Sequence, residues 1–423
     1  MTENSNRGVS QTAAITAFAL GTMYFAYAFI QRVAPSIMTG ELMRDFNVGG
    51  AALGSLSAFY FWTYASIQLP VGMLTDHFGP RKLMSLAAAL CTVAALGFAW
   101  SESLFMASFW RAIIGGCVAF AFVGTLAIAG YWFKHSQMAL LAGILQCIGV
   151  SGAIFAQGML RPIVEAQGWR NTMLVLALVA FVLSIMLFFL VPRRSLDQKE
   201  IRPRQKPSIA DGLRHVITNR QSWVCAIYGF GIASTMLSFA GLWAVPWLST
   251  VHGYSPSQAA GITSTFFIGW AVASPFIGWL SDFLGRRNTI LRLGAVIYIA
   301  AFSTIVFATP DNTSLLVGLL FITGTGGSTM AICFVCVKEL NNPKYTSTAI
   351  GLMNMFVVGS GAVMQPLIGW LLDVNWSGEL VDGARVYSET AYTIGFSSLL
   401  VVMVIGFIST FLLRETGCRQ LVI

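Results

Sequence analysis

Twelve runs of mostly apolar residues divide this chain into long spans joined by short polar segments. The runs cover residues 13–35, 51–74, 83–100, 105–131, 138–160, 171–191, 222–248, 258–280, 289–308, 313–337, 346–373 and 390–413. A hydrocarbon core about 30 Å thick needs roughly 20 apolar residues per helix, so each run can cross a bilayer. Only 10% of the residues are charged, whereas a soluble domain carries about 25%. The pattern predicts an all-α membrane protein with twelve transmembrane helices.

The basic residues indicate how these spans are oriented. Residues 192–220 are rich in Arg, Lys and Pro and form a predicted polar linker between two six-helix halves, 1–191 and 221–423. If the N-terminus is inside the cell, 19 of the 25 Lys and Arg residues fall on the cytoplasmic side, as the positive-inside rule requires. We therefore expect a multi-pass inner-membrane protein with both termini in the cytoplasm. The net charge of +8 follows from this pattern, so the expected partner is the lipid bilayer and not nucleic acid.

A short charged turn occurs twice, each time between two spans. The first copy contains Gly72, Asp76, Gly79, Arg81 and Lys82, and the second contains Gly278, Asp282, Gly285, Arg286 and Arg287. The two aspartates are 206 residues apart, about half of the chain. A second repeat has a nearly equal offset of 208 residues and pairs Gly143, Gln146, Val150 and Gln157 with Gly351, Asn354, Val358 and Gln365. Such spacing predicts two pseudo-symmetric parallel halves.

The turn resembles the loop between helices 2 and 3 of the major facilitator superfamily, and its second copy resembles the loop between helices 8 and 9. This resemblance implies a secondary transporter that works by alternating access. It also implies that the residues of both turns latch the two halves together in the outward-facing state. The alternative is that the turns only set the loop shape and the topology.

Two arginines lie inside the predicted spans, Arg32 in the first and Arg111 in the fourth. A charge in the bilayer is costly unless it faces a watery cavity or a partner, although both could also extend to the outer surface. Helical spacing places polar stripes beside them, formed by Tyr24, Tyr27 and Gln31 in the first span and by Tyr60, Tyr64 and Gln68 in the second. Together these residues predict a cavity with a positive charge.

Amide side chains mark the fifth and eleventh spans. Gln146 is 11 residues before Gln157, and Asn354 is 11 before Gln365, so each pair lies on one helical face. They are predicted either to line the cavity or to form hydrogen bonds between helices. Trp243, in the seventh span, occupies about the position that Arg32 has in the first, and we include it among the expected substrate-binding residues.

Carboxylates and histidines are absent from the middle of the predicted spans, and Asp373 is the acidic residue nearest an interior. A cavity with arginine and without a carboxylate favours an anionic or zwitterionic solute, which balances the charge itself. The solute is then exchanged, moved down its gradient, or coupled to a proton or counter-anion. The segment Tyr27–Arg32 resembles the organophosphate and organic-anion branch of the superfamily, in which an arginine at this place holds the anionic group. That branch has a second arginine where this chain has Trp243, so one carboxylate fits better than a phosphate ester.

Other functions receive less support from the sequence. The first alternative is an efflux carrier for amphipathic compounds such as drugs or siderophores, and the second is a transporter-like solute sensor. An enzyme is not expected, because no nucleophile–base set, metal-ligand cluster or nucleotide loop occurs. We expect no metal and no cofactor, and a monomer.

Overall fold

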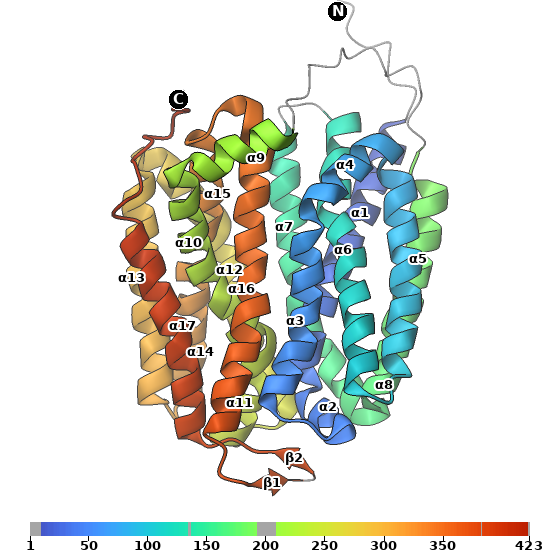
Figure 1. Cartoon of the computed structure of the whole chain (residues 1–423), viewed down its shortest axis with the longest axis vertical. Helices are drawn as coiled ribbons and strands as arrows, with labels where there is room; N and C mark the ends of the chain where they lie inside the picture. The colour runs from blue at the N-terminus through green and yellow to red at the C-terminus, as the bar shows by residue number, and fades with distance from the viewer. Residues whose placement is uncertain (1–9, 134–136, 193–208, 382, 422–423) are drawn as a thin grey trace, which may run out of the picture.

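The computed structural model describes residues 10–133, 137–192, 209–381 and 383–421, which form a bundle of long helices that run side by side (Figure 1). Ten helical stretches are long and apolar enough to cross a membrane. One of them, Leu141–Leu190, contains two predicted spans, because Gly168 (φ 81°, ψ 162°) interrupts the helical backbone between them. Another predicted span, 51–74, consists of two shorter helices that meet at Ile67. The twelve spans are thus all helical, and the predicted fold class is confirmed.

The elements before residue 193 are called the N-terminal group. They are α1 (Gln11–Val33), the 3-10 helix η1 (Ala34–Ile37), α2 (Thr39–Phe46), α3 (Gly50–Ser66), α4 (Gln68–Phe78), α5 (Pro80–Ala99), α6 (Leu104–Trp132), α7 (Met138–Phe155), the π-helix η3 (Ala156–Leu160) and α8 (Arg161–Leu190). In Figure 1 the long helices of this group occupy one side of the bundle.

The elements after residue 208 are called the C-terminal group. They are α9 (Ile209–Thr218), α10 (Arg220–Ser234), the π-helix η5 (Thr235–Trp243), α11 (Ala244–Val251), α12 (Pro256–Leu284), α13 (Arg287–Ala308), α14 (Thr313–Gly327), α15 (Met330–Glu339), the 3-10 helix η6 (Pro343–Tyr345), α16 (Thr346–Val374), β1 (Leu380–Val381), β2 (Ala384–Arg385) and α17 (Glu389–Ser409). The short helix α9 lies within the segment that was predicted as a polar linker. Residues 193–208 of that linker lie outside the described residues.

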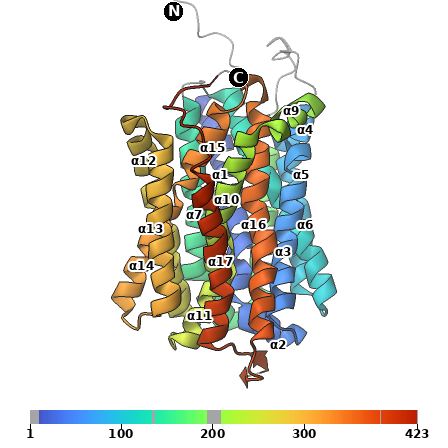
Figure 2. The same ribbon diagram turned by 60° about the vertical axis from the view of Figure 1, so that its left-hand side comes forward.

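The bundle has two distinct ends. The short helix α2 and the antiparallel hairpin β1–β2 lie at one end, called the α2 end, and α9 and the C-terminus lie at the other, called the α9 end (Figures 1 and 2). The predicted orientation puts the α2 end outside the cell and the α9 end in the cytoplasm.

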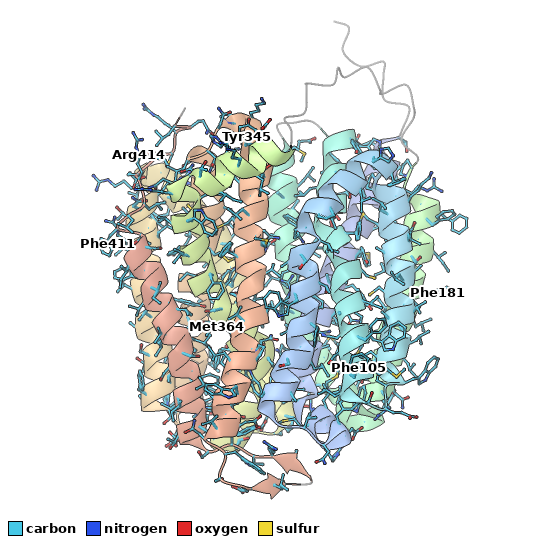
Figure 3. The ribbon with its side chains drawn as sticks, viewed as in Figure 1. Phe105, Phe181, Tyr345, Met364, Phe411 and Arg414 are labelled. Atoms are coloured by element: carbon cyan, nitrogen blue, oxygen red, sulfur yellow. The ribbon has the colours of Figure 1, made fainter. Side chains whose placement is uncertain are left out.

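Apolar side chains cover the outer surface of the bundle, as lipid requires. Phe105, Phe181 and Phe411 are all exposed, and Figure 3 shows Phe181 and Phe411 at opposite margins of the molecule. Such exposed aromatic and aliphatic surface is disfavoured in water and favoured against hydrocarbon. The outer surface of these helices is therefore suited to contact with the hydrocarbon of a lipid bilayer.

Candidate functional site

Two buried arginines lie next to each other in the N-terminal group, on α1 and α6. Arg32 is 6% exposed and Arg111 is 1% exposed. The Nη2 atom of Arg111 donates a hydrogen bond of 3.3 Å to the backbone oxygen of Arg32. Among the described residues, neither guanidinium forms an ion pair with a carboxylate. Two positive charges are thus held together without a compensating anion, which is unfavourable in an apolar environment.

Aromatic rings next to the two guanidinium groups partly stabilise their positive charges. The Cζ atom of Arg32 lies 4.4 Å from the ring centre of Phe29 and 5.5 Å from that of Tyr64. The Cζ atom of Arg111 lies 4.7 Å from the ring centre of Tyr60. Cation–π contacts of this kind contribute about 1–2 kcal/mol, less than a full ion pair in the same place. The Nε atoms of both arginines remain buried without a hydrogen-bond partner among the described residues.

The predicted tyrosine and glutamine stripes surround these arginines, but their members have different roles. The hydroxyl of Tyr24 donates to the backbone oxygen of Cys117 at 3.0 Å, and that of Tyr60 donates to the backbone oxygen of Ala28 at 3.0 Å. These two bonds fix α1 against α6 and α3. Gln31 donates to the Tyr27 hydroxyl at 2.6 Å, while its Oε1 atom has no partner among the described residues.

Four further predicted site residues have no hydrogen bond to the two arginines among the described residues. Trp243 and Gln365 are both fully buried, and the Trp243 Nε1 atom donates to the backbone oxygen of Gln365 at 3.2 Å. The Gln365 side chain donates in turn to the backbone oxygen of Leu237 at 2.7 Å. Gln146 and Asn354 are partly exposed. No hydrogen bond between described residues joins any of these four to Arg32 or Arg111, so their predicted contact with substrate stays a prediction.

The two groups are in direct contact at the α2 end. Five hydrogen bonds between described residues join them, and all five lie at this end. They run from Gly50 N to Asp373 Oδ1 and to Tyr387 OH, from Ala51 N to Asp373 Oδ2, from Gln157 Nε2 to Ala240 O, and from Ser257 Oγ to Glu165 Oε2. Helices α3 and α16 meet there through glycines, because a Cβ atom on Gly369 would lie 2.1 Å from the backbone oxygen of Gly50. The α2 end is therefore closed.

A small hollow separates the groups toward the α9 end. This cavity of about 50 Å³ is lined by Ala65, Ser66 and Gln68 of the N-terminal group and by Leu213, Thr348, Gly351, Leu352 and Met355 of the C-terminal group. The Nε2 atom of Gln68 is buried without a partner among the described residues. The contrast with the α2 end shows a molecule that is closed at one end and less tightly joined at the other.

Sequence reasoning missed the polar residues of the closed end. Arg161 was not among the predicted site residues, but it is buried at the start of α8 and pairs with Glu41 at 2.8 Å and with Glu165 at 3.1 Å. The only sequence signal was the position of Glu165, one helical turn after Arg161. Asp373 had been noted as the acidic residue nearest an interior, but nothing in the sequence identified its partners.

Both repeated turns have a central glycine with positive φ, but ψ differs, being 151° at Gly79 and 23° at Gly285. Gly79 joins α4 to α5 with φ at 81°, and Gly285 joins α12 to α13 with φ at 64°. Glycine adopts a positive φ without strain because it has no Cβ atom. The side chain of Asp76 lies outside the described residues, and Lys82 is exposed. Arg81 lies 5.1 Å from the ring centre of Phe188.

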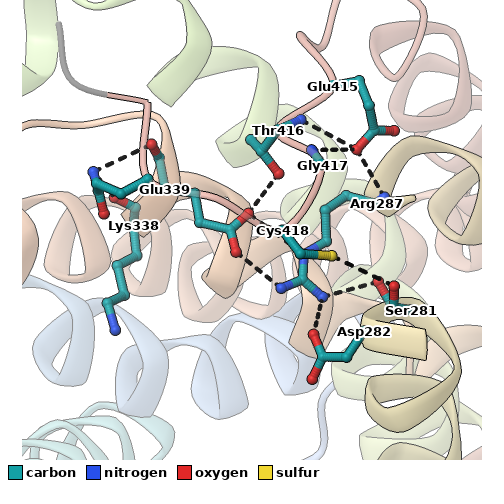
Figure 4. A network of polar contacts seen from close by, with 10 residues as sticks. Ser281, Asp282, Arg287, Lys338, Glu339, Glu415, Thr416, Gly417 and Cys418 are labelled. Atoms are coloured by element: carbon teal, nitrogen blue, oxygen red, sulfur yellow. Dashed lines mark hydrogen bonds and ion pairs between the residues drawn. The ribbon is translucent and has the colours of Figure 1, made fainter. Parts of the chain in front are cut away.

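The second turn forms a charged network within the C-terminal group (Figure 4). Arg287 binds Asp282 at 2.7 Å and Glu339 at 2.8 Å, and Arg286 is exposed. Thr416, in the segment after α17, also donates to Glu339. These contacts lie within one group and do not test the predicted latch between the halves, which stays a prediction.

Glu415 completes this network at the first turn of α13. Its carboxylate accepts hydrogen bonds from the backbone N–H groups of Arg287 and Asn288, at 2.9 and 2.8 Å. Burial raises the pKa of Glu415, but these N–H donors outweigh burial and hold that pKa below its ordinary value. A carboxyl group with a lowered pKa stabilises the fold above its ordinary pKa. That contribution is lost as the pH falls through the lowered value.

Replacing Arg287 by alanine is expected to destabilise the C-terminal group. Its side chain is 7% exposed and that of Glu339 is 10% exposed, so the change leaves a buried carboxylate unpaired, which costs about 3 kcal/mol. Thermal unfolding of the purified variant in detergent should show a melting temperature several degrees below that of the wild type. Arg286→Ala is the control, because this neighbouring arginine is exposed. Equal melting temperatures for both variants would contradict the structural role of the network.

Comparison with known families decides what kind of protein has this architecture. The family model described as the Major Facilitator Superfamily matches residues 20–255 and 231–417, nearly the whole chain. The chain belongs to the Major Facilitator Superfamily. Solved members of similar shape include a bacterial homologue of the lysosomal transporter Spinster, with a TM-score of 0.75 at 17% identity, covering 95% of this chain and 98% of that one. A D-xylose–proton symporter superposes with a TM-score of 0.72 at 16% identity, covering 97% of this chain and all of that one.

Several curated superfamily members match over most of their length. The probable sulfoacetate transporter SauU of Cupriavidus necator is 24% identical, over 90% of this chain and 94% of the relative. The probable galactarate/D-glucarate transporter GarP of Escherichia coli is 21% identical, over 82% and 85%. The gentisate transporter of Corynebacterium glutamicum is 21% identical, over 90% and 87%. All three relatives are named for organic anions, and the predicted resemblance to that branch is confirmed.

Membership in the Major Facilitator Superfamily settles the general function. The protein is a multi-pass membrane protein and a secondary transporter that moves a small solute, and it is not an enzyme. The predicted superfamily and general function are confirmed.

Proposed function

We propose that this transporter carries a small organic anion with a carboxylate or sulfonate group, and that Arg32 is the main anchor for that group. The observation that carries the proposal is the pair of buried guanidiniums, Arg32 and Arg111, without a carboxylate partner among the described residues. A bound anion would supply the missing negative charge and accept hydrogen bonds from the arginines. Guanidinium groups bind carboxylates and similar anions in a two-pronged geometry.

The named substrates of the relatives support the same class. Sulfoacetate, galactarate, glucarate and gentisate all carry an acidic group that is ionised at neutral pH. Glutamine and tyrosine side chains next to the arginines, above all Gln31 with its free Oε1 atom, would contact the rest of such a solute. Arg111 adds a second positive charge, so a solute with two negative charges also fits.

The closed α2 end supports a cycle in which residues 1–191 and 221–423 rock against each other as two halves joined by the linker 192–220. With the orientation predicted from the basic residues, both termini are cytoplasmic and the structure is closed toward the outside. The charged turns would then join the halves at the α9 end once the α2 end opens. A monomer in the inner membrane is sufficient for this cycle, with a proton or a counter-anion as the coupling ion.

Ligand-induced thermal stabilisation tests the substrate class. Purified wild type and Arg32→Ala are heated with a library of carboxylates, sulfonates, phosphate esters, amino acids, dipeptides and amphipathic cations. A ligand that binds only the folded state raises the melting temperature by mass action. We expect carboxylates and sulfonates to stabilise the wild type and not the variant.

Two outcomes contradict this proposal. If only amphipathic cations stabilise the protein, and Arg32→Ala responds equally, the transporter is an efflux carrier for amphipathic compounds. If anions stabilise both proteins equally, the anion class stands and Arg32 is not its anchor.

A further inference from the structure

Asp373 lies where the two groups touch, in the last turn of α16. Its Oδ1 atom accepts hydrogen bonds from Gly50 N at 2.9 Å, from Tyr387 OH at 2.6 Å and from Arg385 Nη1 at 3.1 Å. Its Oδ2 atom accepts one from Ala51 N at 2.8 Å. Two of these donors are backbone groups of the other group of helices. One carboxylate thus joins α16 to α3.

The partners on α3 are the first residues of that helix. The first N–H groups of a helix have no partner inside the helix, and the aligned peptide dipoles give this end a partial positive charge. The residue before the helix is Gly49, which has no side chain to cap it. Asp373 therefore provides the missing cap from the opposite group. A Cβ atom on Gly49 would lie 2.4 Å from Asp373 Oδ1, so the contact also requires glycine at this position.

Two side chains of the C-terminal group hold the carboxylate in place. Arg385, on the hairpin strand β2, also lies 4.3 Å from the ring centre of Trp376. The hydroxyl of Tyr387 donates to Asp373 and accepts from Gly50 N at 2.7 Å, so it reinforces the same contact. These two contacts lie within the C-terminal group, so they orient the carboxylate independently of its contact with α3.

We propose that Asp373 is the latch of the α2 end: its negative charge on the N-terminus of α3 holds that end closed, and the contact breaks each time this end opens. It is a positioning residue of the transport cycle and does not bind the solute. The inference requires the two groups to rock, as in the proposed cycle, but it does not depend on which solute is carried.

The chain contains a matched control for this charge. Glu415 accepts backbone hydrogen bonds from the first residues of α13 in the same manner, at 2.9 and 2.8 Å, but both partners belong to the C-terminal group. Neutralising Glu415 weakens a cap within one group. Neutralising Asp373 weakens a cap between the two groups.

Distance measurements between spin labels at the α2 end test the latch. Labels are placed on cysteines introduced at Gly40 of the N-terminal group and Asp311 of the C-terminal group, which are both exposed. The partly exposed Cys147 and Cys418 are replaced by serine. In full-length protein without solute, Asp373→Asn should raise the ratio of open to closed distances about tenfold, because the charge–dipole attraction is lost. Glu415→Gln should change the ratio far less, because its cap lies within one group.

A second variant keeps the test decisive if Asp373→Asn does not fold. Tyr387→Phe removes one donor from the carboxylate and one acceptor from Gly50, and it should raise the open fraction about threefold. Unchanged distances in a folded Asp373→Asn or Tyr387→Phe variant would overturn the proposal, as would an equal shift in Glu415→Gln. Because no solute is present, none of these results depends on the proposed substrate class.

Discussion

Replacing Arg32 by glutamine is expected to reduce uptake of the organic anion into proteoliposomes by about 100-fold at low substrate concentration. The change removes a buried charge-assisted contact with the solute, and such a loss costs about 3 kcal/mol. Arg32→Lys should retain part of the activity, because it keeps the charge and loses the planar two-pronged geometry. The readout is the initial rate of uptake of a labelled anion, identified by thermal stabilisation.

The matched control for this prediction is Arg44→Gln. Arg44 is an exposed arginine of α2 in the same group of helices, so its loss lowers the net charge equally without touching the cluster. Uptake by Arg44→Gln should equal that of the wild type. Arg111 is a less selective probe, because it also donates to the Arg32 backbone and packs on Tyr60. Wild-type uptake by a well-folded Arg32→Gln would remove the arginine from the substrate site.

The fold could be predicted from the sequence because the bilayer imposes a simple rule. A span must be long, apolar and helical, so Thr346–Val374 (α16) was expected as 346–373 from composition alone. The irregular parts could not be predicted in this way. The short helix α9 in the linker packs against the distant α16. The break at Ile67 between α3 and α4 has a local signal that was overlooked, because Pro70 has no N–H to donate to the carbonyl of Ser66.

The candidate site could be predicted in part. Arg32 and Arg111 were evident because a charge inside an apolar span is conspicuous, and the structure brings them together. The residues that join the two groups were not evident. Asp373 and Gly50 are more than 300 positions apart in the sequence, and their contact depends on the register between two helices, which apolar periodicity does not fix. Trp243 and Gln365 were grouped with the arginines from the repeat, but the structure shows them bonded to each other.

Replacing Gly369 by leucine is expected to prevent the α2 end from closing and to lower transport at least about 100-fold. Its Cβ atom would lie 2.1 Å from the backbone oxygen of Gly50, closer than any real contact allows, and backbone atoms cannot give way as a flexible side chain can. Gly54 shows the same constraint one turn further along, where a Cβ atom would lie 2.5 Å from the backbone oxygen of Gln365. Because these contacts lie between the two groups and not within one, each group should still fold. The measurements are uptake into proteoliposomes and the spin-label distance across the α2 end.

Gly359→Leu provides the control on the same helix. A Cβ atom on Gly359 would meet no atom of another helix within 4 Å, so leucine adds the same volume to α16 at a place where its side chain starts in open space. This variant should transport as the wild type does, with closed distances at the α2 end. A Gly369→Leu variant that retains its melting temperature but shows only open distances would locate the defect in closure. Transport by that variant at the wild-type rate would mean that the cycle does not require α3 and α16 to meet at their glycines.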